Sequence, residues 1–175
     1  MTSEDTEHHR EVERKFRVHG LFRLPELVVG GVTGVEERGT DVLEATYHDT
    51  DDLRLAREGI TMRRRTGGSD AGWHLKVPVP KAPPTVRDEL RLPLDAGEPG
   101  HPPAALLSLV QAVIRDRPVR PVATLRTERT TRMLLGDAGA PVAELVDDTV
   151  SVVDADGHVA ARFRELELEE VGEGA

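Results

Sequence analysis

The chain has 175 residues, a length that suits one domain with at most a small appendage. Hydrophobic residues make up 38% of it and glycines number 16, so the chain can bury a core. The sequence has no apolar run long enough for a transmembrane helix, no secretory signal at the polar terminus MTSEDTEHHRE, and no cysteine. These features exclude disulfides and cysteine nucleophiles, and a cytoplasmic location is the simplest expectation.

The charge balance is acidic, with 23 Lys and Arg against 32 Asp and Glu, for a net charge of −9. Binding to nucleic acid usually needs a basic surface, so we expect neither a nucleic-acid nor a membrane partner. An acidic protein can still concentrate basic side chains in one cavity. The position of the basic residues therefore matters more than their number.

Alternation of apolar and polar residues predicts strands along most of the chain. In chain order, strands are expected over residues 10–18, 42–48, 60–66, 72–78, 85–94, 122–135, 141–153 and 158–170. Helices are expected over residues 21–29, 53–58 and 104–115, and Gly67-Gly68-Ser69-Asp70 predicts a hairpin turn. The sequence thus predicts an α+β fold, mainly antiparallel β, in one domain over residues 10–170 with tails at 1–9 and 171–175.

Charged side chains share one face of many of these strands, because residues i, i+2 and i+4 point to the same side. A solvated sheet face explains such a pattern on one strand. Here Glu and Arg dominate and are concentrated on different strands, while Arg14 and Arg64 fall on the opposite face. Arginine suits bidentate phosphate contact and clustered carboxylates suit Mg²⁺ or Mn²⁺, so the pattern favours a metal–polyphosphate site. The sets are Glu11, Glu13 and Lys15; Arg63 and Arg65; His74 and Lys76; Arg87, Glu89 and Arg91; and Glu165, Glu167 and Glu169.

Other chemistries find no support in the sequence. It has no Walker-type or GxGxxG loop, no metal-binding histidine spacing, and no nucleophile elbow around a serine. Trp73 and Tyr47 are too few for a base-stacking platform.

The segment Glu11-Val12-Glu13-Arg14-Lys15 matches ExExK, and through it the sequence resembles the CYTH superfamily, also called triphosphate tunnel metalloenzymes. Further matches follow in the family's order, so the resemblance spans about residues 10 to 170. They are Tyr47 to Thr50, Met62 to Arg65, Trp73 to Lys76, Arg87 to Glu89, Arg126 to Arg129, Ala143 to Asp148, and Arg164 to Glu167.

The resemblance implies an eight-stranded closed antiparallel β-barrel with a charged tunnel inside and a few helices on its apolar outer surface. It implies metal ligands (Mg²⁺ or Mn²⁺) at Glu11, Glu13, Glu144, Asp148, Glu165 and Glu167. It implies triphosphate-binding cations at Lys15, Arg63, Arg65, Lys76, Arg87, Arg126 and Arg129, and catalytic roles for Glu11, Glu13, Lys15, Glu89 and Glu167. Alternation does not choose between Asp147 and Asp148, and Asp148 is placed inside because it shares a face with Glu144.

The activity implied is metal-assisted hydrolysis of a triphosphate. We favour inorganic tripolyphosphate, because an aromatic content of 3% offers no evident clamp for thiamine or adenine. A thiamine-triphosphatase, an RNA triphosphatase, a class IV adenylate cyclase and a non-catalytic polyphosphate- or nucleotide-binding module are the alternatives.

The carboxyl end is unusual, since the run RELELE is followed only by EVGEGA. This run resembles CYTH domains fused to a CHAD domain, a helical polyphosphate-associated module. We therefore expect either an excised amino-terminal domain, with CHAD as a native fusion partner, or a minimal version of the fold.

Overall fold

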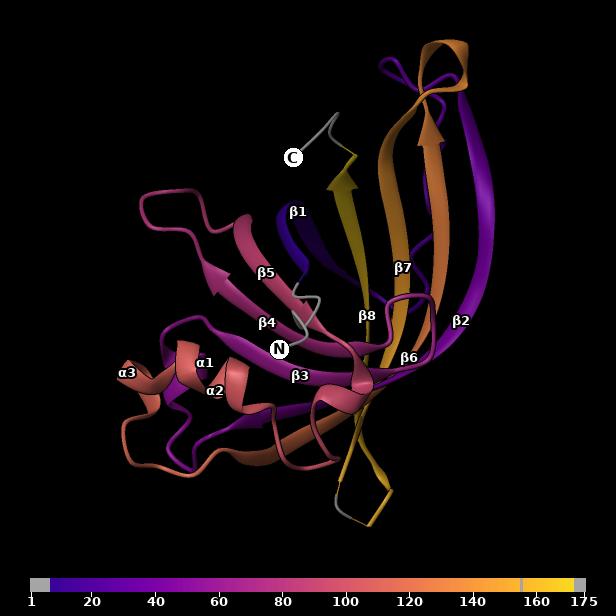
Figure 1. Cartoon of the computed structure of the whole chain (residues 1–175). Coiled ribbons are helices and arrows are strands. Elements are labelled where there is room, and N and C mark those ends of the chain that lie inside the picture. Colours follow the sequence, from indigo (N-terminus) through magenta and orange to yellow (C-terminus); the bar gives the residue numbers. More distant parts are fainter. Residues whose placement is uncertain (1–6, 155, 172–175) are drawn as a thin grey trace.

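The computed structural model describes residues 7–154 and 156–171, with side chains from residue 13 onward. The described residues form eight strands and three short α-helices (Figure 1). The strands are β1 (Glu7–Val18), β2 (Gly34–Asp49), β3 (Thr61–Thr66), β4 (Gly72–Pro78), β5 (Val86–Leu92), β6 (Arg120–Leu135), β7 (Pro141–Val153) and β8 (Val159–Glu170). The helices are α1 (Arg54–Arg57), α2 (Ala104–Leu109) and α3 (Gln111–Ile114).

All strand pairs are antiparallel, in the order β1-β5-β4-β3-β2-β6-β7-β8 and back to β1. β1 pairs with β5 through residues 7–12 and with β8 through residues 13–18, so each of these pairings uses only half of the strand. The sheet curls into a half-barrel in Figure 1. The sequence therefore predicted the mainly antiparallel strands of the fold, whereas the expectation of a closed barrel, implied by the resemblance, is only partly met.

Three elements differ from the expected ones. β2 begins at Gly34 instead of residue 42, because it pairs with β6 through a charged stretch that shows no alternation. Residues 21–29 form no helix; Leu24 and Leu27 pack against the sheet from an irregular segment. The helix expected over 104–115 is interrupted at Val110, whose φ of −107° and ψ of 8° separate α2 from α3.

The main hydrophobic core lies outside the curled sheet, between β3–β5 and the three helices. Trp73, Leu75 and Met62 point outward and are almost completely buried against Leu55 of α1 and Leu106 of α2. Side chains at alternate positions on the same strands therefore point into the curl. Packing on the outer face thus leaves the inner face to polar residues.

A second apolar cluster covers the outer face of β6–β8. Leu134, Leu145 and Leu166 are buried there, beneath Leu24 and Leu27 of the β1–β2 connection. Because both walls of the curled sheet carry an outer apolar cover, the charged side chains on their other faces point into the interior, where Leu43, Leu125 and Val150 also lie.

Asp49, at the end of β2, holds α1 against the sheet. Its buried carboxylate accepts hydrogen bonds from the backbone N–H groups of Thr50, Leu55 and Ala56, at 2.7, 2.9 and 3.0 Å. The side-chain oxygen of Thr50 accepts the N–H of Arg54 at 3.0 Å. The helix start expected at residues 50–52 therefore depends on Asp49 and Thr50, which satisfy N–H groups that a short helix leaves open.

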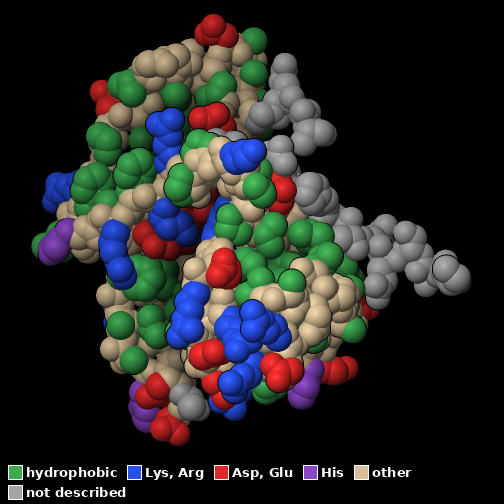
Figure 2. All heavy atoms as spheres, turned by 90° about the vertical axis from the view of Figure 1, so that its left-hand side faces the viewer, with side chains coloured by type: hydrophobic (Ala, Val, Ile, Leu, Met, Phe, Trp, Pro, Cys, Tyr) green, Lys and Arg blue, Asp and Glu red, His purple; other side chains and the backbone are tan. Residues whose placement is uncertain are grey.

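The helix side of the molecule carries a mixed surface, where basic and acidic side chains lie next to one another between hydrophobic ones (Figure 2). Across the two described ranges, no helix has the length and apolar content needed to span a membrane.

Candidate functional site

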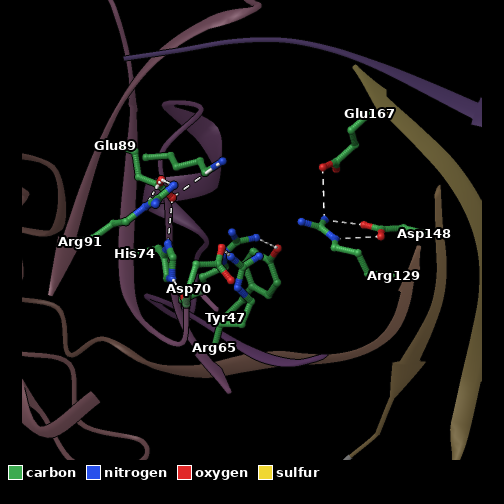
Figure 3. Close-up of polar contacts among 11 residues, drawn as sticks. Tyr47, Arg65, Asp70, His74, Glu89, Arg91, Arg129, Asp148 and Glu167 are labelled. Carbon is green, nitrogen blue, oxygen red and sulfur yellow. Dashed lines mark hydrogen bonds and ion pairs between the residues drawn. The ribbon is translucent and has the colours of Figure 1, made fainter. Parts of the chain in front are cut away.

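The interior site is built by period-two alternation on neighbouring strands. Register pairs Arg63 of β3 with His74 of β4, and Lys76 of β4 with Glu89 of β5. On the opposite wall it pairs Arg129 of β6 with Asp148 of β7, and Asp148 with Glu165 of β8. Residues from β3–β5 and from β6–β8 therefore face the same interior (Figure 3).

Three carboxylates on β7 and β8 form the acidic part of this site. Asp148, Glu165 and Glu167 each offer an oxygen atom, and these atoms lie within 4.8 Å of one another. Asp148 is 3% exposed, and the two glutamates are half-buried. Clustered hard oxygen ligands of this kind suit Mg²⁺ or Mn²⁺, so the donor set fits a divalent cation.

Two cations neutralise this cluster. Arg129 donates two hydrogen bonds to the carboxylate of Asp148, at 2.9 and 2.6 Å, and one to Glu167 at 3.3 Å. The amino group of Lys15 lies 2.5 Å from Glu167 and 3.6 Å from Glu165. The acidic cluster is thus interleaved with groups that also suit phosphate.

The pKa values of these groups reflect both burial and pairing. Burial raises the pKa of Asp148 and of Glu165 above the ordinary carboxyl value, despite the nearby cations. Burial acts in the same direction on Glu167, but Lys15 and Arg129 outweigh it and hold its pKa below the ordinary value. Burial opposes the charge of Lys15, yet Glu167 and its neighbours keep the pKa of that amine raised.

The opposite wall is cationic. Arg63 and Arg65 project inward from β3, and a guanidinium nitrogen of Arg63 lies 3.4 Å from the phenol oxygen of Tyr47. Burial and the guanidinium groups of Arg63 and Arg129 lower the pKa of Arg65 to about 9. The buried Nε atoms of Arg63 and Arg65 have no hydrogen-bond partner among the described residues. Crowded guanidinium groups with unsatisfied donors are suited to receive an anion.

Glu89 organises a network beside this wall, and its side chain is completely buried. It lies 2.9 Å from Nδ1 of His74, accepts the Nε–H of Arg91 at 2.6 Å, and lies 3.8 Å from the amine of Lys76. A buried carboxylate held by cations on its own and the adjacent strand fixes the rotamers of those cations. Glu89 therefore positions basic side chains in this structure.

The two walls enclose a cavity of about 50 Å³. Its lining includes Lys15, Arg63, Arg65, Arg129 and Glu167. Arg129 and Leu43 also line an adjoining groove of about 450 Å³, which opens past the β3–β4 hairpin. The cavity has room for a small cation and the adjoining groove has room for a polyanion, with Arg129 lining both.

A family model described as the CYTH domain matches residues 9–173. The chain belongs to the CYTH family. Members of this family act as triphosphatases or cyclases and are metal-dependent.

Among proteins similar to this CYTH chain are two uncharacterized proteins of Mycobacterium tuberculosis, from strains CDC 1551 and H37Rv. Each is 44% identical over 172 residues, and the match covers 92% of this chain and 33% of the relative. The chain therefore spans about a third of the length of these relatives. The crystal structure of a putative adenylate cyclase from Bacillus halodurans has a TM-score of 0.61 at 17% identity, covering 95% of this chain and 83% of that one, which shows a shared fold.

Among the described side chains, nine of the expected site residues face the CYTH interior, namely Lys15, Arg63, Arg65, Lys76, Glu89, Arg129, Asp148, Glu165 and Glu167. Two further expected cations are engaged elsewhere. Arg126 lies on the outer face of β6, 56% exposed, and pairs with Glu44 at 2.8 Å. The resemblance implies that Arg126 binds triphosphate, but alternation along β6 places its side chain on the face opposite to that of Arg129. Arg87 shares a face with Glu89. Its guanidinium, however, donates a hydrogen bond to the main-chain carbonyl of Gly59.

The remaining acidic residues are placed less centrally. Asp147 lies on the outer face and forms a bidentate pair with Arg164, which leaves Asp148 as the interior residue of the two. Glu144 lines the adjoining groove, and burial raises its pKa. Glu13 is half-buried, and its negative charge is one of those that raise the pKa of Lys15. Glu11 pairs with Arg87 through the backbone, but its side chain lies outside the described residues.

Four residues without an assigned role in the sequence analysis contribute to the site, although His74 and Arg91 already belong to its charged strand faces. His74 and Arg91 bond to Glu89, and strand alternation already placed them on the charged face. Tyr47 contacts Arg63 from β2, in the part of the strand that the sequence predicts over residues 42–48. Asp70 contacts Arg65 from the hairpin turn, and no periodicity could have indicated that contact.

Proposed function

We propose that the protein is a metal-dependent hydrolase of triphosphate compounds, with inorganic tripolyphosphate as its substrate. The observation that carries the proposal is the cavity in which Arg63, Arg65 and Arg129 face the carboxylates of Asp148, Glu165 and Glu167. Tripolyphosphate is a compact polyanion that matches a cluster of guanidinium groups without needing an apolar or aromatic clamp.

In this proposal the basic residues bind the phosphate groups and the acidic residues bind the metal ion. Arg63, Arg65 and Arg129, joined by Lys15 and Lys76, would hold the phosphate oxygens and fix the substrate's orientation. Donors already in place in a buried site stabilise charge that develops in the transition state, because they need no reorganisation. Glu89 would keep Lys76 and Arg91 in position.

Asp148, Glu165 and Glu167 would hold the divalent cation, Mg²⁺ or Mn²⁺, with Glu11 and Glu13 from the middle of β1. When bound, such a cation neutralises charge on phosphate oxygens and lowers the pKa of coordinated water. The raised pKa values of Asp148 and Glu165 support this role, since burial disfavours carboxylates that have no additional positive charge nearby. Lys15 and Arg129 supply part of that charge.

A substrate panel tests the proposal. Orthophosphate release is measured with tripolyphosphate, thiamine triphosphate, ATP and long-chain polyphosphate, each with Mg²⁺ or Mn²⁺, and cyclic AMP is measured in the ATP reactions. We expect the highest kcat/KM for tripolyphosphate. Cyclic AMP formed from ATP without free orthophosphate would establish a cyclase instead, and binding without turnover of any compound would establish a binding module.

A cytoplasmic location belongs to the same proposal.

A further inference from the structure

Asp70 lies in the hairpin between β3 and β4, where the interior opens toward the adjoining groove. Its carboxylate contacts the guanidinium of Arg65, whose side chain is only 4% exposed, whereas Asp70 itself is 30% exposed. Asp70 also lines the groove that shares Arg129 with the interior cavity. The hairpin therefore brings a partly exposed carboxylate against one of the buried cations.

The backbone fixes this placement. Gly67 has a φ of +80°, and a Cβ there would collide with the carbonyl oxygen of Val42. At the other end of the turn, the carbonyl of Asp70 lies 2.9 Å from Nε2 of His74, whose Nδ1 lies 2.9 Å from Glu89. The turn is thus held at both ends, so the carboxylate of Asp70 has little freedom to leave Arg65 by movement of the main chain.

We propose that Asp70 competes with phosphate for Arg65 and thereby sets the affinity of the site for phosphate compounds. This proposal rests on the proposed function, since it assumes that Arg65 receives a substrate phosphate. A carboxylate and a phosphate use the same donors of a guanidinium group, so a phosphate binds Arg65 only after displacing Asp70. Because the displaced carboxylate lies at the groove, it can turn toward solvent.

The competition lowers the affinity of every phosphate compound that uses Arg65 by the same factor. Orthophosphate bound at Arg65 exchanges one ion pair for another, so it gains less than it would from a guanidinium without a carboxylate partner. A triphosphate that reaches Arg63 and Arg129 as well adds contacts that do not involve Asp70. A triphosphate therefore still binds, whereas the orthophosphate that hydrolysis releases is held weakly.

Competition has a direct thermodynamic consequence. If the site is open for only a fraction of the time, the apparent dissociation constant equals the intrinsic constant divided by that fraction. Asp70→Asn removes the competing charge and keeps the backbone carbonyl that meets His74. A charge-assisted contact of about 1.4 kcal/mol corresponds to about tenfold, so we expect about tenfold tighter binding.

The test is calorimetric titration of the intact chain with tripolyphosphate and, separately, with orthophosphate, in the presence of a chelator so that no turnover occurs. Asp70→Asn is compared with the wild type and with Asp41→Asn. Asp41 lines the same groove and its substitution removes the same charge, but it lies on β2 in register with Arg129 and not against Arg65. We expect Asp70→Asn to bind both ligands about tenfold more tightly, and Asp41→Asn to change either affinity less than about threefold.

A double-mutant cycle tests whether the effect of Asp70→Asn depends on its contact with Arg65. In an Arg65→Ala background, Asp70→Asn should no longer tighten binding, because no guanidinium is left to contest. Equal or weaker binding by Asp70→Asn, or the same gain with and without Arg65, would overturn the proposal. Wild-type hydrolysis of tripolyphosphate, assayed separately with metal, tests the proposed function alone; its absence alongside the expected affinities would reject the chemistry and leave the competition standing.

Discussion

Arg129 and Asp148 face each other across the β6–β7 pairing and are joined by two hydrogen bonds, at 2.9 and 2.6 Å. Arg129 also reaches Glu167 on β8, so one guanidinium joins the carboxylate cluster to the cationic wall. Without Arg129, the buried Asp148 would lose its bidentate partner and the cavity one of its phosphate donors.

Arg129→Ala should therefore weaken both substrate binding and the fold. Loss of a charge-assisted phosphate contact typically costs a factor of about ten to a hundred in affinity, and breaking a buried ion pair costs about 3–5 kcal/mol. Binding is measured by titration with tripolyphosphate, and stability by urea unfolding. Arg126→Ala is the control, since Arg126 lies on the same strand with its side chain outside. Equal effects of the two substitutions would contradict the assignment of faces on β6.

Alternation on β3 gives a second prediction. Arg63→Ala and Arg65→Ala should each weaken tripolyphosphate binding about tenfold to a hundredfold, whereas Arg64→Ala should change it little, because Arg64 points to the other side of the strand. The three variants carry the same change in charge, and circular dichroism checks that each is folded. Comparable losses at all three positions would show that these cations act through net charge.

The carboxylate cluster gives a third prediction, on metal affinity. Glu165→Gln and Glu167→Gln each remove one charged oxygen ligand, so Mn²⁺ affinity should fall about tenfold or more, a typical effect of losing a charged contact. Glu170→Gln is the matched control, because Glu170 is an exposed residue of the same strand. Metal binding is followed by calorimetry in the absence of substrate. Unchanged Mn²⁺ affinity in both interior variants would place the cation elsewhere.

The pH dependence follows from the raised pKa values of Asp148 and Glu165. Metal binding needs both carboxylates ionised, and a raised pKa means that they take up protons at higher pH than ordinary carboxyl groups. As the pH falls, kcat/KM should therefore decrease along an acid limb whose midpoint lies above the ordinary carboxyl value. Because protons and metal compete for the same oxygens, a higher Mg²⁺ concentration should move this limb to lower pH. A limb that does not move with Mg²⁺ would assign it to another group.

Glu89 gives a prediction on stability. Glu89→Gln removes a buried charge from between the half-buried Arg91 and Lys76, so the free energy of unfolding should fall by about 3 kcal/mol. Urea unfolding measures this loss. Glu128→Gln, an exposed position on β6, should be close to neutral. A stability equal to wild type would mean that Glu89 is not needed to hold these cations.

Most of the sequence prediction rests on the alternation of apolar and polar residues along the strands. This alternation identified the strands and placed Arg63, Arg65, Glu89 and Glu167 on inner faces, because each lies on a strand with regular alternation. The assignment of Arg126 to the interior is wrong because it rests on a motif, whereas alternation relative to Arg129 places Arg126 on the outer face. Alternation could not give the first half of β2, where a β-bulge between Glu37 and Gly39 and a run of charges hide the pattern.

Contacts made by residues in turns cannot be predicted from strand alternation. Asp70 meets Arg65, and Asp49 caps α1, only because the hairpin and the β2–α1 connection fold back on the strands. Their positions depend on tertiary geometry and not on local periodicity. The asymmetric covering of the sheet, with helices over β3–β5 and an irregular segment over β6–β8, is of the same kind.

The most direct measurement is the initial rate of orthophosphate release from tripolyphosphate by chelator-treated protein, before and after Mg²⁺ or Mn²⁺ is restored. Glu167→Gln serves as the variant with an impaired acidic cluster and Glu170→Gln as its control. We predict no release without metal, recovery of the rate on addition of either cation for the wild type and Glu170→Gln, and little recovery for Glu167→Gln. Full hydrolysis by the metal-free protein, or no hydrolysis with either cation, would contradict a metal-dependent triphosphatase.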